Sequence, residues 1–166
     1  MKKLVTSAIF ILIFHLGFSQ TMNNEKMGTI LESVSDSIQG QNGQWQFKIK
    51  DVLLMCITDT NHNRMRIISP ITEAKRLDDK LKSAALVANF HTALDVKYAI
   101  ADDVLWSVYI HPLKELTEAQ VRDAVSQVYA ANITFGTTFS STDLVFPGSN
   151  KKEEKKKKKE LIREEY

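Results

Sequence analysis

The stretch that decides the fold runs from Leu94 to Phe135 and reads LDVKYAIADDVLWSVYIHPLKELTEAQVRDAVSQVYAANITF. In its first half, apolar residues alternate with smaller or polar ones in two runs, and Asp102 and Asp103 separate the runs. Alternation with a period of two places each apolar set on one face of a sheet, and short carboxylates are typical of tight turns. This half therefore predicts a β-hairpin.

The second half of the stretch changes to the period of an α-helix after Pro112. Thr117 and Gln120 stand three residues apart at its start, in the pattern of a capping box. One face of the expected helix carries Val121, Val125, Val128 and Asn132. A helix with an apolar stripe, next to a hairpin with an apolar face, predicts that helix and sheet pack on each other.

The chain before this stretch predicts two more helices and three more strands. An amphipathic helix is expected within Thr21–Gln39, and a second helix with a stripe of small residues from about Leu77 to His91. Strands are expected at residues 45–50, 52–57 and 64–71, joined by short turns. Short turns imply antiparallel pairing, so the fold class is α+β, with the order α-β-β-β-α-β-β-α and helices packed on an antiparallel sheet.

Charge is distributed unevenly over the 166 residues, whose formal net charge is +2. The first nineteen residues carry +2 and residues 151–166 carry +3, so residues 20–150 carry −3. A folded nucleic-acid-binding domain needs Lys and Arg clustered on one surface, which this pattern does not indicate. We divide the chain into a signal peptide at 1–19, one α+β domain at 20–148 and a charged tail at 149–166.

The first nineteen residues, MKKLVTSAIFILIFHLGFS, have a charged start, an apolar run from Leu4 to Phe18 and small residues just before Gln20. This pattern predicts a secretory signal peptide cleaved after Ser19. An uncleaved membrane anchor is the alternative, but the fifteen residues of the run span roughly 22 Å as a helix, short of the ~30 Å hydrocarbon core. We expect an exported bacterial protein, periplasmic or secreted, with no transmembrane segment after cleavage.

The charged tail ends in KKEEKKKKKELIREEY, in which glutamates interrupt the lysines. Such a run buries too little apolar surface to offset the entropy of ordering, which predicts disorder. A weak contact with an anionic surface, without specific recognition of nucleic acid, is expected from Lys155, Lys156, Lys157, Lys158 and Lys159. Ahead of the tail, Leu144, Val145 and Phe146 are expected to pack against the domain.

Residues that usually carry catalysis or bind metals do not form a recognisable group in this sequence. The four histidines lack the spacing of metal ligands, and the turn Asp59–Asn63 lacks the Gly and Glu that complete a calcium-binding loop. Cys56, the single cysteine, lies in the apolar run VLLMCI and is expected to be buried. His111 is expected to contact the backbone beside Pro112. The sequence therefore predicts no catalytic residue, no metal site and no cofactor.

Several motifs resemble the YbjN family. They are WQFKIKDVLL at 45–54, LVAN at 86–89, VKYAIADDVLWSVYIHPL at 96–113, and the helix that starts at Leu116-Thr117 and ends near Phe135-Gly136. The resemblance covers about Met22 to Phe146 and implies the fold of class I type III secretion chaperones. Those chaperones are usually dimeric and bind effector segments on helix and sheet surfaces without a cofactor. The resemblance therefore implies protein binding and a homodimer.

The expected sheet offers a candidate partner-binding surface. Leu105 and Tyr109 stand on the opposite face from Trp106, and they form an exposed apolar patch if helices leave their face uncovered. The best hypothesis is an exported, non-enzymatic protein-binding or chaperone-like module. A periplasmic protein that binds a small ligand in a cavity between the second helix and the sheet is the alternative, and an enzyme ranks third.

Overall fold

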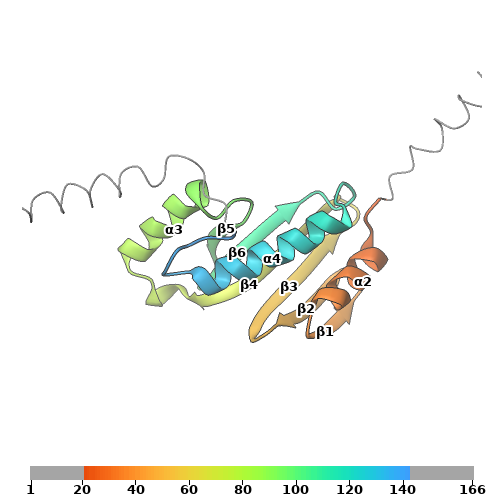
Figure 1. The fold of residues 1–166 in the computed structure, drawn as a ribbon, viewed down its shortest axis with the longest axis horizontal. Helices are drawn as coiled ribbons and strands as arrows, with labels where there is room; N and C mark the ends of the chain where they lie inside the picture. Colours follow the sequence, from red (N-terminus) through yellow and green to blue (C-terminus); the bar gives the residue numbers. More distant parts are fainter. Residues whose placement is uncertain (1–20, 143–166) are drawn as a thin grey trace, which may run out of the picture.

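The computed structural model of the protein describes residues 21–142. The predictions for the signal peptide, for Leu144, Val145 and Phe146 and for the lysine-rich tail concern residues outside this range. The described residues form an α+β fold, in which three α-helices pack on a six-stranded antiparallel sheet (Figure 1). This confirms the predicted fold class.

Six strands form one sheet in the spatial order β1-β2-β3-β4-β6-β5. They are β1 (Ser37–Gln41), β2 (Gln44–Ile49), β3 (Val52–Asp59), β4 (Arg64–Glu73), β5 (Lys97–Ala101) and β6 (Val104–His111). The predicted hairpin, β5–β6, joins the first four strands through β6, which pairs with β4. The two edges of the sheet are consequently β1 and β5.

Each α-helix begins after a residue whose side chain caps it. The helices are α2 (Asn24–Val34), α3 (Asp79–His91) and α4 (Glu118–Thr134), and a 3-10 turn, η2 (Ala74–Arg76), precedes α3. Asn23, Asp78 and Thr117 each accept a hydrogen bond from the backbone N–H three residues later. Gln120 completes the predicted capping box with Thr117. No helix in the described range is long and apolar enough to cross a membrane.

The core lies between the sheet and the two helices α2 and α4. α4 crosses the centre of the sheet over β4 and β6, α2 lies over β1 and β2, and α3 lies at the opposite end of the molecule beside β5 (Figure 1). The largest fully buried side chains include Met27, Leu31, Phe47, Leu54, Ile67 and Val125. α3 contributes only the small residues Ala85 and Ala88 to the buried set. The end of the domain that carries α3 is therefore the less deeply packed end.

Strand β1 was not expected from the sequence. Residues 37–39, which we placed at the end of the first helix, form β1 together with Gly40 and Gln41, and that helix ends at Val34. Ile38 fits the helical spacing of the preceding apolar residues, yet it pairs with Phe47 of β2. Gly40 has φ +104°, a left-handed backbone that a helix does not contain. Pairing with β2 therefore overrides the local helical period at this point.

The turn of the β5–β6 hairpin has the predicted chemistry. Asp102 and Asp103 have φ values of 50° and 59°, and Ala101 pairs directly with Val104. A two-residue hairpin turn with left-handed backbone at both central positions matches the twist of the flanking strands, and Asp tolerates that backbone better than most residues. The turn thus fixes the register that decides which β6 side chains face α4.

Candidate protein-binding surfaces

The two faces of the sheet have different environments. Side chains on the face toward α2 and α4 are buried, and we call it the covered face. The alternate side chains point to the other face, over which no described helix lies. We call it the open face, and its apolar members are Leu53, Met55, Ile57, Ile68, Trp106, Val108 and Ile110. These residues are partly exposed or exposed, although none of them is polar.

Leu105 and Tyr109 lie on the covered face, so the patch expected from them is not exposed. Leu105 is 3% exposed and Tyr109 is 7% exposed. Burial, together with the nearby carboxylates of Asp95 and Asp123, raises the pKa of the Tyr109 phenol. The physical reason is that α4 packs on the face that contains Leu105 and Tyr109. The candidate partner-binding surface is therefore the opposite face of the sheet, which contains Trp106.

Strand register arranges the open face in rows. The first row consists of Gln46, Met55, Ile68, Val108 and Lys97. The second row consists of Gln44, Ile57, Arg66 and Ile110. Ile57 is 39% exposed and Ile110 is 60% exposed. Neighbouring strands lie about 4.8 Å apart, so Met55, Ile68 and Val108 form a contiguous apolar surface across β3, β4 and β6, whereas Arg66 lies between Ile57 and Ile110 in the second row.

The open face is hollowed toward the β1 edge of the sheet. Two depressions of about 190 and 460 Å³ lie there, on either side of Gln39 and Gln46, whose amide side chains are hydrogen-bonded at 3.3 Å. Leu53 lines one depression, and Met55 and Ile57 line the other. The surface is thus concave and apolar at its floor, with amides along one rim.

Basic side chains flank the apolar part of the open face. Lys48 on β2, Arg66 on β4 and Lys97 on β5 are exposed there, and Lys48 and Arg66 make no side-chain hydrogen bond or ion pair within the described residues. The carboxylates on this face lie at strand ends. Asp59 contacts His62, and Glu73 forms ion pairs with Lys75 and Arg76. The open face therefore carries positive charge around its apolar centre.

The end of the domain that carries α3 holds a second uncovered apolar surface. Leu86, Val87 and Phe90 on α3 are 70%, 60% and 81% exposed, and Ile100 on β5 is 51% exposed. Beside them, a cavity of about 350 Å³ opens between α3, the sheet and the end of α4. Apart from Lys82, its lining is uncharged: Leu77, Leu81, Ala85, Leu86, Tyr98, Ala99, Ile100, Leu105 and Phe135.

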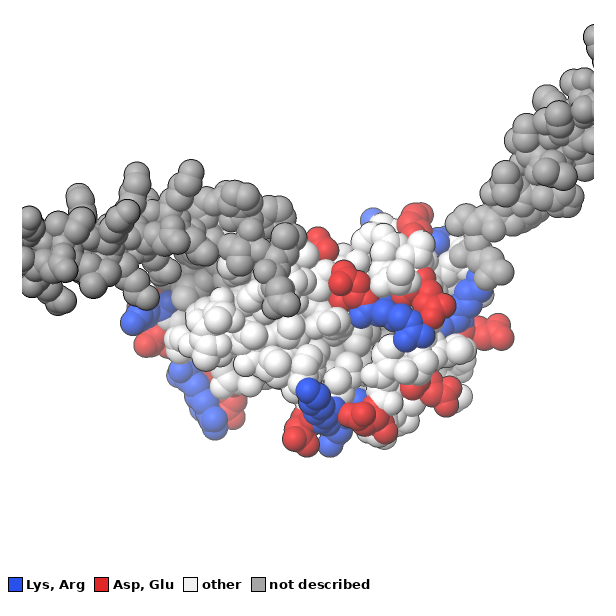
Figure 2. Space-filling model, in the orientation of Figure 1, with Lys and Arg blue, Asp and Glu red and all other residues white. Residues whose placement is uncertain are grey.

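Charge is distributed differently on the side of the molecule that shows the helices. Acidic and basic side chains gather around α2 and the first turns of α4, whereas few charged atoms of the described residues lie between α3 and the last turns of α4 (Figure 2). Arg122 and Glu118 form an ion pair of 2.7 Å within the charged part. Mixed charge around α2 is typical of a solvated surface, and the uncharged area adjoins the exposed side chains of α3.

The free edge of β5 is closed by a side chain of α3. Asn89 Oδ1 accepts a hydrogen bond from the Tyr98 backbone N–H at 2.7 Å, and Asn89 Nδ2 donates to the Tyr98 carbonyl at 3.1 Å. The Asn89 amide thus supplies the two bonds that a further strand would make at this point. β5 is therefore protected against pairing with another chain, which is the usual hazard of an edge strand.

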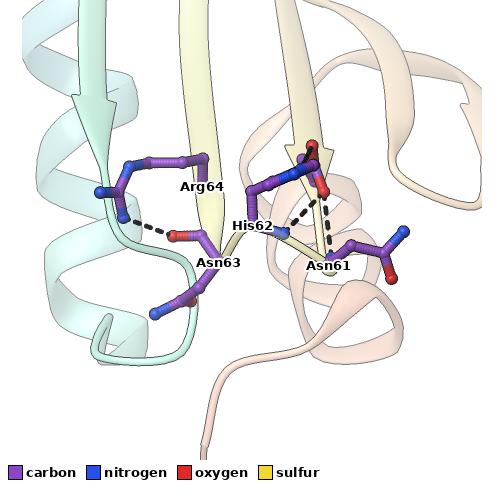
Figure 3. Close-up of polar contacts among 5 residues, drawn as sticks. Asn61, His62, Asn63 and Arg64 are labelled. Carbon is purple, nitrogen blue, oxygen red and sulfur yellow. Dashed lines mark hydrogen bonds and ion pairs between the residues drawn. The ribbon is translucent and has the colours of Figure 1, made fainter.

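The β3–β4 turn contains most of the polar residues that invite a catalytic or metal-binding interpretation (Figure 3). Asp59 Oδ1 accepts hydrogen bonds from the backbone N–H groups of Asn61 and His62 at 3.0 and 2.9 Å, and Asp59 Oδ2 lies 2.7 Å from His62 Nδ1. Backbone and side-chain hydrogen bonds from His62 lower the pKa of Asp59. Both carboxylate oxygens are occupied, so this is a self-contained turn.

Asn63 connects this turn to the loop before α4. Its backbone is left-handed, with φ 52°, and its Oδ1 accepts a hydrogen bond from the Lys114 N–H at 2.8 Å. Its Nδ2 donates to both oxygens of Glu115, at 3.1 and 2.9 Å, and this contact lowers the pKa of Glu115. Arg64 Nη1 donates to the Asn63 carbonyl. Asn63 therefore links two loops, whereas the contacts drawn in Figure 3 lie within the β3–β4 turn.

The other residues singled out in the sequence have structural positions. Cys56 is fully buried, as predicted, and burial raises the pKa of its thiol to about 12. His111 Nδ1 lies 2.8 Å from the Pro112 carbonyl, which agrees with the predicted backbone contact. Among the described residues, no three His, Cys, Asp or Glu side chains are grouped closely enough to hold a metal ion.

Sequence reasoning missed the exposed side chains that now define the candidate surfaces. Ile57 and Ile110 lie in predicted strands but were not identified as exposed, and Phe90 was not singled out in the second helix. Such side chains can be recognised in a sequence where one strand is apolar on both faces. In β6, Leu105 and Trp106 are neighbours, although a strand with one solvent-exposed face usually alternates apolar with polar residues. Such a strand is either central in a three-layer fold or exposes a binding surface.

No protein-family model and no curated protein matches the chain. Solved structures do match its fold. A chain of the HopA1–SchA chaperone–effector complex matches with a TM-score of 0.51 and 12% identity, over 68% of this chain and 88% of that chain. A chain of the Yersinia pestis type III secretion chaperone SycH in complex with a stable fragment of YscM2 gives 0.51 and 13%, over 68% and 96%. The described domain therefore has a fold similar to that of type III secretion chaperones.

Proposed function

We propose that this chain, with its type III secretion chaperone-like fold, is a non-enzymatic protein-binding module that acts as a chaperone or in a chaperone-like way. The observation that carries the proposal is the open face: a contiguous apolar sheet surface that no described helix covers. Large exposed apolar patches on a soluble domain mark protein-binding sites. The likeness to chaperone structures supports the fold of such a module.

The open face has the features of a protein interface. Met55, Ile68 and Val108 form its apolar centre, Ile57 and Ile110 are exposed on either side of Arg66, and Trp106 supplies a large aromatic surface. Glutamine and lysine side chains form a polar rim. Interfaces combine an apolar, aromatic centre with a polar, wet rim. Burial of apolar area contributes about 25 cal/mol per Å², so covering these side chains provides a driving force for binding.

The test compares substitutions on the two sides of the domain. Ile110→Ser and Ile68→Ser remove apolar area from the open face, and Thr29→Ser on the exposed surface of α2 serves as the control. We expect the first two variants to lose the ability to hold a reduced and alkylated, permanently unfolded protein in solution, and the control to keep it. Wild-type activity in both open-face variants would overturn the assignment of the binding surface.

We also propose that α3 mediates self-association into a homodimer. Phe90 and Leu86 project from the domain beside the apolar cavity lined by Leu81 and Ile100. A projecting apolar group next to an apolar hollow on the same surface is self-complementary across a two-fold axis. In such a dimer each protomer inserts side chains of α3 near the cavity of its partner.

Light scattering of the chain from Gln20 to Tyr166 over a concentration series tests this arrangement. We expect a dimer that Phe90→Ser converts to a monomer, while Ile133→Ser, at the similarly exposed Ile133 of α4, leaves the mass unchanged. A wild-type monomer at every concentration would contradict self-association but would leave binding at the open face untouched.

A second candidate function follows from the cavity itself. An open, mainly apolar cavity of about 350 Å³ suits a small apolar ligand, and Lys82 at its lining suits an anionic group on such a ligand. Binding of a fluorescent fatty acid, with a stoichiometry that does not change with protein concentration, would support this function. Loss of that binding in Ile100→Glu, with the open face intact, would separate it from protein binding.

Export, the YbjN relationship and the role of the tail complete the proposal. The signal-like start of the sequence supports a periplasmic or secreted location, which N-terminal sequencing of the mature protein tests: we expect it to begin at Gln20. The motifs quoted for the YbjN family support that relationship. The lysine run at 155–159 supports a weak contact with anionic surfaces. Deletion of residues 149–166 should abolish binding of the protein to an anionic surface.

A further inference from the structure

We infer that the segment bound by the open face is an acidic amphipathic helix of about five to six turns, presented by a partner protein. The inference rests on the proposed function and names the chemistry of the partner. Three independent features of the open face lead to it: the state of its backbone hydrogen bonds, its length and its charge.

The backbone of the central strands excludes an extended partner on this face. β2, β3, β4 and β6 each pair with a neighbour on both sides, so their N–H and C=O groups are engaged within the sheet. A segment that lies on the face therefore has no backbone partners there and must satisfy its own N–H and C=O groups. An α-helix does so internally, whereas a single strand does not.

The length of the face fixes the length of the helix. β3 and β4 contain 8 and 10 residues, which at about 3.3 Å per residue gives a face of roughly 26–33 Å. A helix of about 17–22 residues spans this distance at 1.5 Å per residue. α4, which packs across the covered face of the same sheet, has 17 residues. The partner helix would thus form a third layer opposite α4.

The charge of the face fixes the charge of the helix. Lys48, Arg66 and Lys97 stand on three sides of the apolar centre, while Asp59 and Glu73 are engaged at strand ends. Glutamates on both flanks of an apolar helical stripe would meet these cations. Opposite charges at the rim of an interface accelerate association and select against basic partners. The contacts are exposed, so salt should weaken them.

The experiment uses the chain from Gln20 to Tyr166 and four labelled 18-residue peptides, with binding followed by fluorescence anisotropy. The first peptide carries leucines at helical spacing with glutamates on the flanks. The second replaces the glutamates by lysines, the third replaces them by glutamines, and the fourth keeps the glutamates but has two central prolines. We expect the first peptide to bind at least tenfold more tightly than each of the others, and 0.5 M NaCl to remove most of its advantage over the glutamine peptide.

Charge-reversal variants locate the contact. Arg66→Glu should weaken binding of the glutamate peptide about tenfold, whereas Lys80→Glu, the same charge change on the exposed side of α3, should leave it unchanged. Circular dichroism before titration shows that both variants are folded. An equal effect of the two variants, or equal affinity for the glutamate and lysine peptides, would overturn the inference.

Two outcomes separate this inference from the proposed function. If the peptides bind equally and Ile110→Ser weakens all of them, the open face binds protein but the acidic helix is wrong. If Ile110→Ser changes nothing, the open face is not the binding surface and both ideas fail. Tighter binding after deletion of residues 149–166 would show that the tail, which contains Glu160, Glu164 and Glu165, occupies the face in place of a partner.

Discussion

The covered and open faces of the sheet differ in their surroundings far more than in their composition. On β6, the set under α4 consists of Leu105, Ser107 and Tyr109, and the set on the open face consists of Trp106, Val108 and Ile110. Both sets are mainly apolar, but helices of the same domain cover only the first. The second set belongs to the open face, on which the proposed binding depends, because contiguous exposed apolar area commonly marks an interaction site.

Matched substitutions on the two faces should differ most in their effect on the free energy of unfolding in β4, where Ile67 and Ile68 are neighbours on opposite faces. Ile67 is fully buried and Ile68 is partly exposed. Ile67→Ala leaves a cavity beneath α4 and should lower the free energy of unfolding by about 3–4 kcal/mol. Ile68→Ala removes the same atoms from a face without a helix and should cost about 1 kcal/mol. Urea denaturation of both variants measures the difference.

Equal losses in the free energy of unfolding for Ile67→Ala and Ile68→Ala would contradict this difference between the faces, because they would mean that the open face is packed as tightly as the covered one. A larger loss in Ile68→Ala that appears only at high protein concentration would instead indicate that a second copy covers the open face.

The covered face also holds two ionisable groups that burial keeps protonated. Burial raises the pKa of Cys56 from 9.0 to about 12 and that of Tyr98 from 10.0 to about 12. Above pH 9 the unfolded chain releases the Cys56 proton while the folded chain retains it. Stability is therefore full below pH 9 and falls as the pH rises from 9 toward 12, by about 2 kcal/mol at pH 10.5 from Cys56 alone.

Thermal or urea unfolding between pH 8 and 10.5 measures this loss, and Cys56→Ala provides the control. The variant is less stable at every pH because it leaves a small cavity. Its free energy of unfolding should nevertheless fall less steeply with pH between pH 9 and 10 than that of the wild type. Identical slopes would show that the thiol ionises in the folded protein and that the covered face is open to water at Cys56.

Much of the fold could be predicted from the sequence because local signals agree with the global structure. The Asp102-Asp103 turn, the Thr117 capping box and the burial of Cys56 each follow from neighbouring residues. β1 could not be predicted in this way. Ile38 continues the helical spacing of α2, and only pairing with Phe47, which lies nine residues further on, makes it a strand residue.

The candidate surface was harder to predict than the fold for a related reason. Alternation in β6 separates Leu105 and Tyr109 from Trp106, but it does not say which set lies under α4, since both sets are apolar. The pairing of β6 with β4, which sets Tyr109 opposite the buried Ile67, decides the matter, and this pairing joins residues distant in sequence. The charge of the open face is likewise assembled from strands β2, β4 and β5, whose basic residues are scattered along the chain.

Removal of the polar contacts that hold α4 on the covered face should lower the free energy of unfolding by a smaller amount. Asn132 Nδ2 donates to Ser69 Oγ and to the Pro70 carbonyl, both at 2.8 Å, and Ser107 Oγ donates to the Val128 carbonyl at 3.1 Å. Asn132→Ala leaves two partly buried acceptors without this donor and should cost about 1–2 kcal/mol. The free energy of unfolding in urea measures it, with Ser126→Ala on the exposed side of α4 as the control. A loss no larger than that of the control would mean that water replaces the amide and that α4 is held by apolar packing alone.

The smallest effect on stability is expected at Ile110 on the open face, where the largest effect on binding is expected. Ile110 is 60% exposed, so Ile110→Ser removes little buried area and should change the free energy of unfolding by no more than about 0.5 kcal/mol. The same change should lower the fluorescence of a dye that binds exposed apolar surfaces, because it replaces an exposed apolar side chain beside Val108 by a polar one. If Ile110→Ser destabilised the domain by several kcal/mol, the side chain would be buried in solution, by a second copy or by the tail. If stability and dye binding were both unchanged, the dye would bind the surface around α3. The open face would then not be the principal apolar surface of the domain.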